Sequence, residues 1–458
     1  MKSDNTIRET LSTYIRKHNL TFTQFSSMSD VNAGSLSRIL QGNKPISIRQ
    51  LESITSAMNL PEDFLFESYV EECFAFTTSM RRIRPFIIRC AELNRLDLIE
   101  RIVHRLLEDL SYTSDLFEVA EALFASNHGQ AAEIIYTQVS EAERFQHSER
   151  LTTCRYRLFE LSLGNDIEEN LRSAIFFEPY VSRLDEADQL DALKELIDVM
   201  VTAHKWKKVD ELAVEMLRVA TTQYERRSTE RTAKRPFYFY ILYGWLIRSF
   251  ICEEYEDFDG ALSYVSKYAQ GELWVREDDE EAHRHIHQFA EWGTANRYLY
   301  RVLSGEAEAL GEYADFVASR PDEIFIALGF MVKAANRFDF DIDRILERFS
   351  AYIPSIEAEG RYGPYNNSVV KEKLAQFFSD LGVYRFKRGH GNAISFILEG
   401  LRLAVRINSI KNILNGLTRF EMYREWASKE EKQDFKLLSG EVNRINEKNR
   451  HLVILGYE

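Results

Sequence analysis

A run of helical segments, each roughly 12 to 18 residues long, begins near residue 69 and continues almost to the end of the chain. Short polar turns separate the segments, and no stretch shows a convincing strand pattern. Only 8 Pro and 20 Gly occur in 458 residues, so few positions interrupt a helix, while 45% of the residues are hydrophobic and can form a core. The sequence therefore predicts an all-α protein with room for two or three domains or one solenoid.

The helical segments come in pairs, and a small residue in the second helix is followed by large apolar residues four and seven positions later. Ala132, Tyr136 and Val139 show this spacing. The fullest match comprises Phe377, Tyr384, Ala393, Ile397 and Gly400. These positions resemble the tetratricopeptide pattern, in which small residues let paired helices approach closely. The resemblance implies an α-solenoid over residues 69–435, and an unrelated all-α body is the alternative.

The first 60 residues carry a different series of signals, with capping residues between short apolar segments. Apolar residues within 7–18 share one face of a first helix. A second short helix, which Thr21 or Thr23 can cap, is expected to bury Phe25 and Met28. The pattern indicates a small helical domain ahead of the repeated body.

A third helix follows, because Asn32 can cap its start and Gly42 can end it. Asp30 stands in the turn before it and tolerates a left-handed conformation. The block SLSRILQGN at residues 35–43, followed by Pro and the segment LESITSAMNL, resembles the lambda-repressor-like (XRE-type) helix-turn-helix family. The resemblance covers residues 1–68 and implies a DNA-binding domain there.

In that family the N-terminal end of the third helix enters the major groove of DNA. The matching positions that would face base edges are Asn32, Ala33, Gly34 and Arg38. Arg38 is the best candidate, because a guanidinium can pair bidentately with guanine. The positions that would meet phosphates are Thr21, Thr23, Ser35, Gln41, Asn43 and Lys44. The alternative is that all of these are ordinary polar surface residues.

Local charge favours the DNA-binding interpretation. Residues 1–50 carry seven Lys or Arg and three Asp or Glu, a balance of +4, whereas the whole chain is at −14. A basic end on an acidic body suits a protein that touches nucleic acid at one end only. A second basic cluster, which could meet flanking phosphates or form a solvated helix face, comprises Arg81, Arg82, Arg84 and Arg89.

An XRE-type domain on a degenerate tetratricopeptide body resembles the RRNPP family of peptide-sensing regulators from Gram-positive bacteria and their phages. The segments at residues 68–103 and 393–417 look most like the arbitrium receptors and their chromosomal relatives. The resemblance implies a cytoplasmic, quorum-sensing-type transcription regulator and a homodimer. It also implies that a short signalling peptide in the concave face of the solenoid controls binding to an operator in double-stranded DNA.

A short extended peptide exposes backbone amides and charged ends. Asn side chains can clamp its backbone, and Arg can pair with its carboxylate. Residues 294–301 and 333–338 share an Ala-Asn-Arg core, 40 positions apart. The expected peptide-binding residues, each of which could instead be an ordinary helix-surface residue, are Tyr240, Tyr243, Asn296, Arg297, Tyr300, Arg301, Asn336, Arg337, Asn366, Asn367, Tyr384 and Arg385.

Signals for an enzyme are weak, and we expect neither catalytic residues nor a cofactor. His283 and His287, in the sequence HRHIH, could share a helix face as zinc ligands do, but no third ligand is evident, so a solvated or partly packed helix is favoured and no metal is expected. The chain has no Gly-rich phosphate loop and no GxSxG motif. The other alternative is a protein-interaction regulator that sequesters a partner through the helical body.

Other segments bear on location and assembly. The four Cys show no disulfide or metal spacing. No apolar run is long enough to span a membrane, and the first residues have no apolar signal core. A reducing cytoplasm is therefore the expected location. Residues 361–367 include Gly-Pro and are expected to form a loop or hinge. Residues 436–458 carry Leu438, Val442 and Ile445 on one stripe and are expected to cap the solenoid and support dimerisation.

Overall fold

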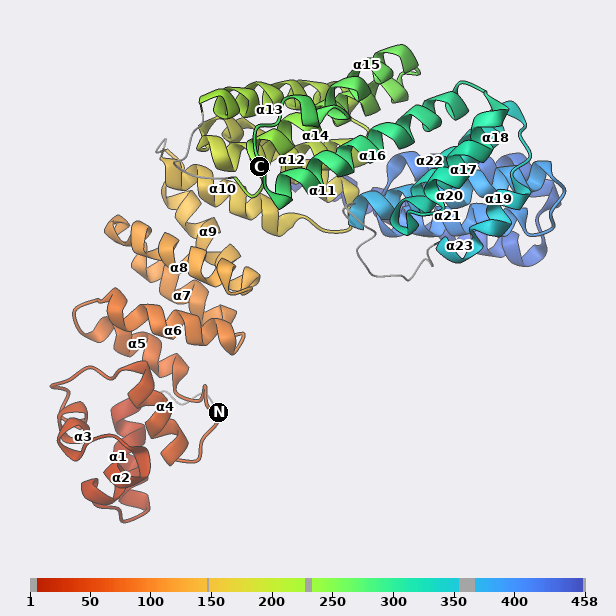
Figure 1. Cartoon of the computed structure of the whole chain (residues 1–458). Helices are drawn as coiled ribbons and strands as arrows, with labels where there is room; N and C mark the ends of the chain where they lie inside the picture. Colours follow the sequence, from red (N-terminus) through yellow and green to blue (C-terminus); the bar gives the residue numbers. More distant parts are fainter. Residues whose placement is uncertain (1–5, 146–147, 227–232, 354–366, 456–458) are drawn as a thin grey trace. The chain divides into compact units, whose positions relative to one another are not determined.

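The computed structural model confirms the all-α prediction over the part of the chain that it describes. It describes residues 6–145, 148–226, 233–353 and 367–455, with the side chains of 367–369, 446 and 448–455 left out. Every regular element in these ranges is a helix. Contacts divide the chain into two compact units, Met1–Leu161 (unit 1) and Ser162–Glu458 (unit 2), whose helices are labelled in Figure 1.

Unit 1 is built from short helices whose starts follow from capping residues. Thr6, Thr21 and Ser47 each form a capping box with the side chain three positions later. The α-helices of unit 1 in the described ranges are α1 (Ile7–Lys17), α2 (Phe22–Ser29), α3 (Ala33–Leu40), α4 (Ile48–Ala57), α5 (Phe66–Ala75), α6 (Met80–Glu92), α7 (Leu96–Leu106), α8 (Thr113–Ala125), α9 (Gly129–Ala142) and α10 (Glu149–Ser162), whose last residue belongs to unit 2. The predicted domain boundary at residue 68 falls within α5.

The turns around α3 adopt the predicted left-handed conformations. Asp30, at the end of α2, has φ 50°, and Gly42, just after α3, has φ 74°. The prediction that Phe25 is buried is confirmed, but the prediction for Met28 is wrong, because its side chain is 50% exposed. The inward face of α2 continues from Phe25 to Ser29, one full turn on, and this register leaves Met28 in solvent.

The core of α1–α4 is only partly their own. Leu11, Leu36 and Ile54 belong to a small apolar cluster confined to these helices. Ile39 and Leu51 instead join a larger cluster that continues through α5 to α9. Residues 1–68 therefore share apolar burial with the helices that follow.

Polar contacts also tie α1 and α3 to α5. The Arg8 guanidinium donates two hydrogen bonds of 2.6 Å to the Glu72 carboxylate and one of 2.8 Å, from Nε, to the carbonyl of Ile39. The Tyr69 hydroxyl donates at 2.8 Å to the carbonyl of Ile46. Because Ile39 lies in α3 and Ile46 lies in the loop after it, α5 positions both the helix and its exit.

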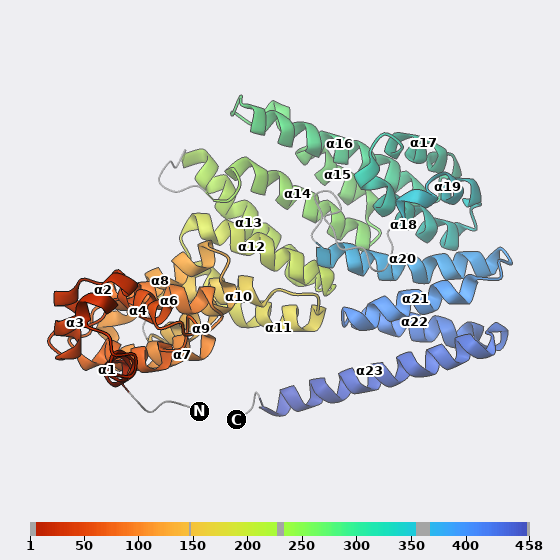
Figure 2. The same cartoon turned by 90° about the horizontal axis from the view of Figure 1, so that it is seen from below.

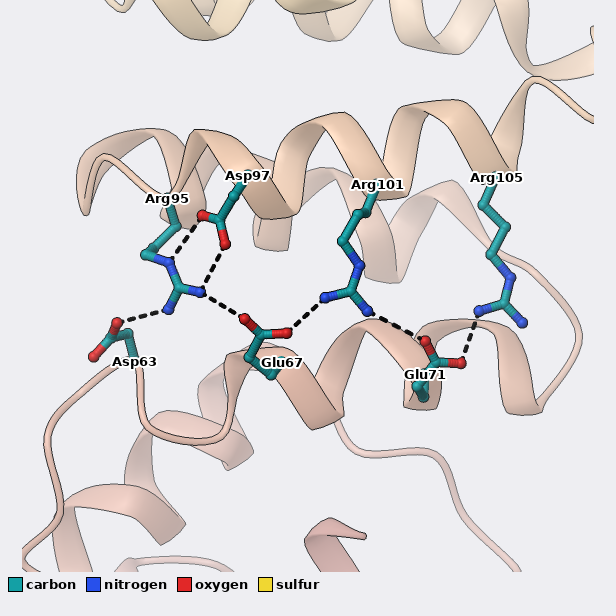
Figure 3. Close-up of polar contacts among 7 residues, drawn as sticks. All are labelled: Asp63, Glu67, Glu71, Arg95, Asp97, Arg101 and Arg105. Carbon is teal, nitrogen blue, oxygen red and sulfur yellow. Dashed lines mark hydrogen bonds and ion pairs between the residues drawn. The ribbon is translucent and has the colours of Figure 1, made fainter. Parts of the chain in front are cut away.

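Acidic and basic side chains form a ladder between α5 and α7 (Figure 3). The pairs with nitrogen–oxygen distances of 2.7, 2.6 and 2.8 Å are Arg95 with Asp63, Arg101 with Glu67 and Arg105 with Glu71. Asp97 also accepts hydrogen bonds from Arg95. Most of these groups are exposed, so each pair stabilises unit 1 by at most about 1 kcal/mol, but the linked row favours one register of α5 on α7.

Unit 2 contains longer helices that pack against their sequence neighbours. Among its described residues the α-helices are α11 (Ile167–Phe177), α12 (Glu186–Thr202), α13 (Trp206–Arg226), α14 (Phe237–Glu254), α15 (Phe258–Tyr268), α16 (Glu280–Leu303), α17 (Ala307–Val317), α18 (Pro321–Phe338), α19 (Asp343–Arg348), α20 (Asn367–Lys387), α21 (Ala393–Arg406), α22 (Ile410–Tyr423) and α23 (Lys429–Leu455). Helices α20 to α23 lie side by side, with α21 in contact with each of the other three (Figure 2).

Small residues let helices of unit 2 approach closely, as predicted at Gly400. A Cβ atom at Gly400 would stand 2.7 Å from the carbonyl oxygen of Ala375, on α20. Gly382 on α20 has the same relation to Ala393 on α21, also at 2.7 Å. Leu438, on α23, is buried. No helix in the described ranges is both long and apolar enough to cross a membrane.

Candidate nucleic-acid interface and ligand cavity

The N-terminal end of α3 presents the residues predicted to face base edges. The Asn32 side chain caps the helix by accepting a hydrogen bond from the backbone N–H of Gly34 at 2.9 Å. Asn32, Gly34 and Arg38 are exposed, and Ala33 is half-buried. Arg38 donates from Nε to the carbonyl of Gly34 at 3.2 Å, which draws the guanidinium toward the start of α3. No described contact uses its terminal Nη1 and Nη2 groups, the donors that a base would engage.

The residues predicted to meet phosphates lie around α2 and α3 and are polar and accessible. The Thr21 side chain caps α2, and Thr23 is exposed one position into that helix. Lys44 donates from Nζ to the Ser35 hydroxyl at 3.2 Å, so the lysine is held against α3. The Gln41 and Asn43 side chains, both exposed, are linked at 3.4 Å.

The second basic cluster is largely engaged within unit 1. Arg82 donates from Nη2 to the carbonyl of Cys73 at 2.7 Å. Arg89 forms ion pairs with Glu52, Glu62 and Glu92. Its neighbour along the helix, Arg84, lies 3.7 Å from Glu118. Three of the four arginines are therefore engaged by other groups of unit 1.

Unit 2 encloses a cavity of about 540 Å³, hereafter the unit 2 cavity. One face of α14, at positions 239, 243, 246, 250 and 253, forms one wall, and faces of α16 and α18 form others. The spacing of three or four residues on α14 places all of these side chains on the same side of the helix. The lining also includes Lys194 and Asp198 of α12, Lys373 of α20, Tyr313 of α17 and Arg235 just before α14.

Three residues predicted to bind a peptide line this cavity. The Tyr243 hydroxyl donates to Asp198 at 2.6 Å. Asn296 donates from Nδ2 to the Tyr268 hydroxyl at 2.8 Å, so its amide oxygen is the end with no described partner. Tyr300 donates to Ser249 at 3.4 Å. The three side chains are thus held by their own neighbours while facing one space.

Among the described side chains, the other residues predicted to bind a peptide lie outside this cavity. Tyr240 and Tyr384 are buried and bond to Asp191 and Asp343, and Asn336 donates to the carbonyl of Asp380. Arg297 is exposed, and the remaining arginines contact other side chains: Arg301 contacts Glu306 and Glu312, Arg337 contacts Glu256, and Arg385 contacts His390. Asn366 and the side chain of Asn367 lie outside the described residues, as does the predicted loop before them.

Glu253, Trp292, Phe330 and Lys373 line the cavity and were not among the predicted residues. The apolar stripe on α14 could have revealed Glu253, because a lone acid among aromatic residues at helical spacing stands out. Burial raises the pKa of Glu253 to about 7, and the charges of Lys373 and Lys333 offset only part of that effect. The cavity therefore contains a carboxyl group that titrates near neutrality.

The histidine run lies on α16, and its three side chains have separate contacts. His285 is buried, and burial lowers its pKa, while its Nδ1 lies 3.2 Å from the Tyr238 hydroxyl. His283 and His287 are exposed and contact Asp278 and Glu291. Within the described part of the chain, no three His, Cys, Asp or Glu side chains gather as metal ligands, and the four Cys are free thiols.

No protein-family model matches this chain, and no curated protein matches it. Its function therefore has to be inferred from the chemistry of the α3 surface and of the unit 2 cavity.

Proposed function

We propose that this protein is a DNA-binding transcription regulator that responds to a short peptide. Residues 1–68 act as a helix-turn-helix reader, and the unit 2 cavity holds the peptide. The observation that carries the proposal is a capped helix with an exposed polar N-terminal end, in a chain that also encloses a cavity with aromatic and charged walls.

The DNA-binding part rests on the surface of α3. A groove-reading helix needs exposed donors near its N-terminus and flanking groups that reach phosphates. Arg38 and Asn32 supply the former, and Lys44, held by Ser35, supplies a positive charge beside them.

The ligand-binding part rests on the size and lining of the cavity. Its volume falls within the range of roughly 300–1,000 Å³ that is typical of ligand sites. Its lining combines apolar and aromatic side chains with charged side chains of both signs. A short peptide, which combines apolar side chains with charged ends, suits such a wall.

The two activities would be coupled by population shift. A peptide that binds one conformation of the protein better than another changes the DNA affinity by the same factor by which DNA changes the peptide affinity. A homodimer would strengthen the response, because two linked readers engage two half-sites.

The test is fluorescence anisotropy of the full-length protein on labelled DNA from its own upstream region, with and without a synthetic peptide encoded by the neighbouring reading frame. Salt is held constant, because phosphate contacts make affinity salt-dependent. We expect the peptide to change DNA affinity. Arg38→Ala should weaken specific binding by about 1–3 kcal/mol, or roughly 5- to 150-fold. Arg16→Ala removes an equal charge from an exposed site on α1 and is the matched control.

Two results would count against the proposal. Absence of DNA binding by the wild-type protein would remove the reader assignment. Tight binding that is indifferent to peptide would remove the ligand-gating assignment.

A second candidate function is sequestration of a partner protein by the helical body. Large apolar side chains on α22 and just beyond it favour it, since Leu414, Met422 and Trp426 are each about 60% exposed. Under this alternative, Arg38→Ala leaves activity intact, which separates it from the first proposal.

A further inference from the structure

Glu253 differs from the other acidic side chains of the unit 2 cavity because no hydrogen bond or ion pair engages it among the described residues. Asp198 accepts a hydrogen bond from Tyr243, and Glu323 accepts one from the Trp292 indole at 3.1 Å. Glu253 is only 4% exposed, and its Oε1 atom is fully buried without a hydrogen bond. A buried carboxyl group without a partner destabilises the folded protein, and a bound group that donates a hydrogen bond would remove that cost.

Nearby cations do not neutralise Glu253 directly. Lys333 and Lys373 are close enough to lower its pKa, yet neither forms an ion pair with it among the described contacts. The ammonium group of Lys373 instead stands over the rings of Phe250 and Phe330, at 5.2 and 5.3 Å from their centroids. The ammonium group thus contacts aromatic faces, and no described ion pair engages the carboxyl group of Glu253.

Two tyrosine hydroxyl groups that sense the charge of Glu253 bond to other side chains. The charge of Glu253 raises the pKa of both Tyr268 and Tyr300. Tyr268 accepts from Asn296, and Tyr300 donates to Ser249. No described side chain therefore fills the hydrogen-bonding capacity of this carboxyl group from within the fold.

A carboxyl group beside aromatic walls is suited to a cation. Glu253 continues the stripe of α14 that contains Phe239, Tyr243 and Phe250, so acid and rings face the same space. An ammonium or guanidinium group gains both a charge-assisted hydrogen bond and contact with ring faces in such a place. We infer that Glu253 receives a cationic group of the bound peptide, either its free amino end or a Lys or Arg side chain. The inference rests on the proposed peptide-binding function.

The experiment incubates full-length protein with pools of short random-sequence peptides and identifies those that co-elute with it by mass spectrometry. One pool lacks Lys and Arg and has free amino ends, a second is the same pool acetylated, and a third is acetylated but contains Lys and Arg. We expect enrichment from the first or the third pool, which identifies the source of the cation, and none from the second. Glu253→Gln should reduce that enrichment by about tenfold or more, because a hydrogen bond to a charged group is lost.

The matched control is Glu256→Gln, which removes an exposed carboxylate paired with Arg337 and should leave enrichment unchanged. Thermal melting separates ligand recognition from a structural use of Glu253. Removing an unpaired buried charge should leave the melting temperature equal or higher, whereas loss of a structural pair with Lys373 should lower it.

The inference is overturned if the acetylated pool without Lys or Arg is enriched equally, if Glu253→Gln keeps the preference for cations, or if that variant melts lower than wild type. Its failure is distinguishable from failure of the proposed function. Cation-dependent enrichment without any effect on DNA affinity would remove only peptide gating. A peptide that changes DNA affinity equally in wild type and Glu253→Gln would remove only the assignment of Glu253.

Discussion

Replacing Arg8 by Met is expected to destabilise unit 1 by about 3 kcal/mol. The Glu72 carboxylate, of which 4% is exposed, would lose both of its 2.6 Å hydrogen bonds and stay buried. Breaking a buried pair in this way typically costs about 3–5 kcal/mol. The Arg8 side chain is 23% exposed, so water screens part of the interaction, and the lower end of that range applies. The carbonyl of Ile39 would also lose its donor.

The distribution of tryptophan allows the two units to be followed separately. All five Trp of the chain lie in unit 2, so tryptophan fluorescence reports that unit, whereas far-ultraviolet circular dichroism reports helices of both. For a unit of this size, a loss of about 3 kcal/mol lowers the melting temperature by roughly 6–12 °C. Arg8→Met should therefore shift part of the dichroism transition and leave the fluorescence transition in place.

A double-mutant cycle tests whether the cost comes from the stranded carboxylate. Arg8→Met combined with Glu72→Leu removes both charges, and the double variant should be more stable than Arg8→Met alone. The reasoning is refuted if Arg8→Met costs less than about 1 kcal/mol, or if the two substitutions are simply additive. Because Arg8 also holds the end of α3, the same variant should weaken DNA binding even at temperatures where unit 1 is folded.

Two further predictions concern unit 2. Gly400→Ala should lower the free energy of unfolding by about 1–3 kcal/mol, because the added Cβ meets the backbone carbonyl of Ala375 at 2.7 Å. Urea denaturation followed by tryptophan fluorescence measures this change. Gly311→Ala is the control and should be neutral or stabilising, because an added Cβ there meets no neighbouring group within 4 Å. Burial acts to raise the pKa of Glu372, but the hydrogen bond with His204 and nearby lysine charges hold it below its usual value. The ionised Glu372 therefore stabilises the folded protein above a pH of about 4.3, and this stabilisation is lost as the pH falls through the lower pKa of the folded state. Glu372→Gln should consequently reduce the acid-dependent fall in the free energy of unfolding when that energy is measured against pH.

Helix boundaries could be predicted from the sequence because they depend on residues only a few positions apart. Asn32 and Gly42 mark the two ends of α3, and the structure places a cap at the first and a left-handed residue at the second. The close helix approach at Gly400 was also predictable, because the spacing of small and large residues within one helix marks it, and only a residue without a side chain fits there. Met28 shows the limit of such reasoning, because either three- or four-residue spacing could have continued the buried face of α2.

The composition of the cavity was decided by tertiary structure. Asn296 and Asn336 are the central residues of two copies of the Ala-Asn-Arg triplet. Asn296 lines the cavity, whereas Asn336 bonds to the backbone of α20. Helical periodicity gives the relative orientation of residues on one helix but not the partner that each face meets. Glu253 and Lys373 lie 120 positions apart and become neighbours only because α14 and α20 border the same space. That proximity depends on the packing of whole helices, which no local pattern records.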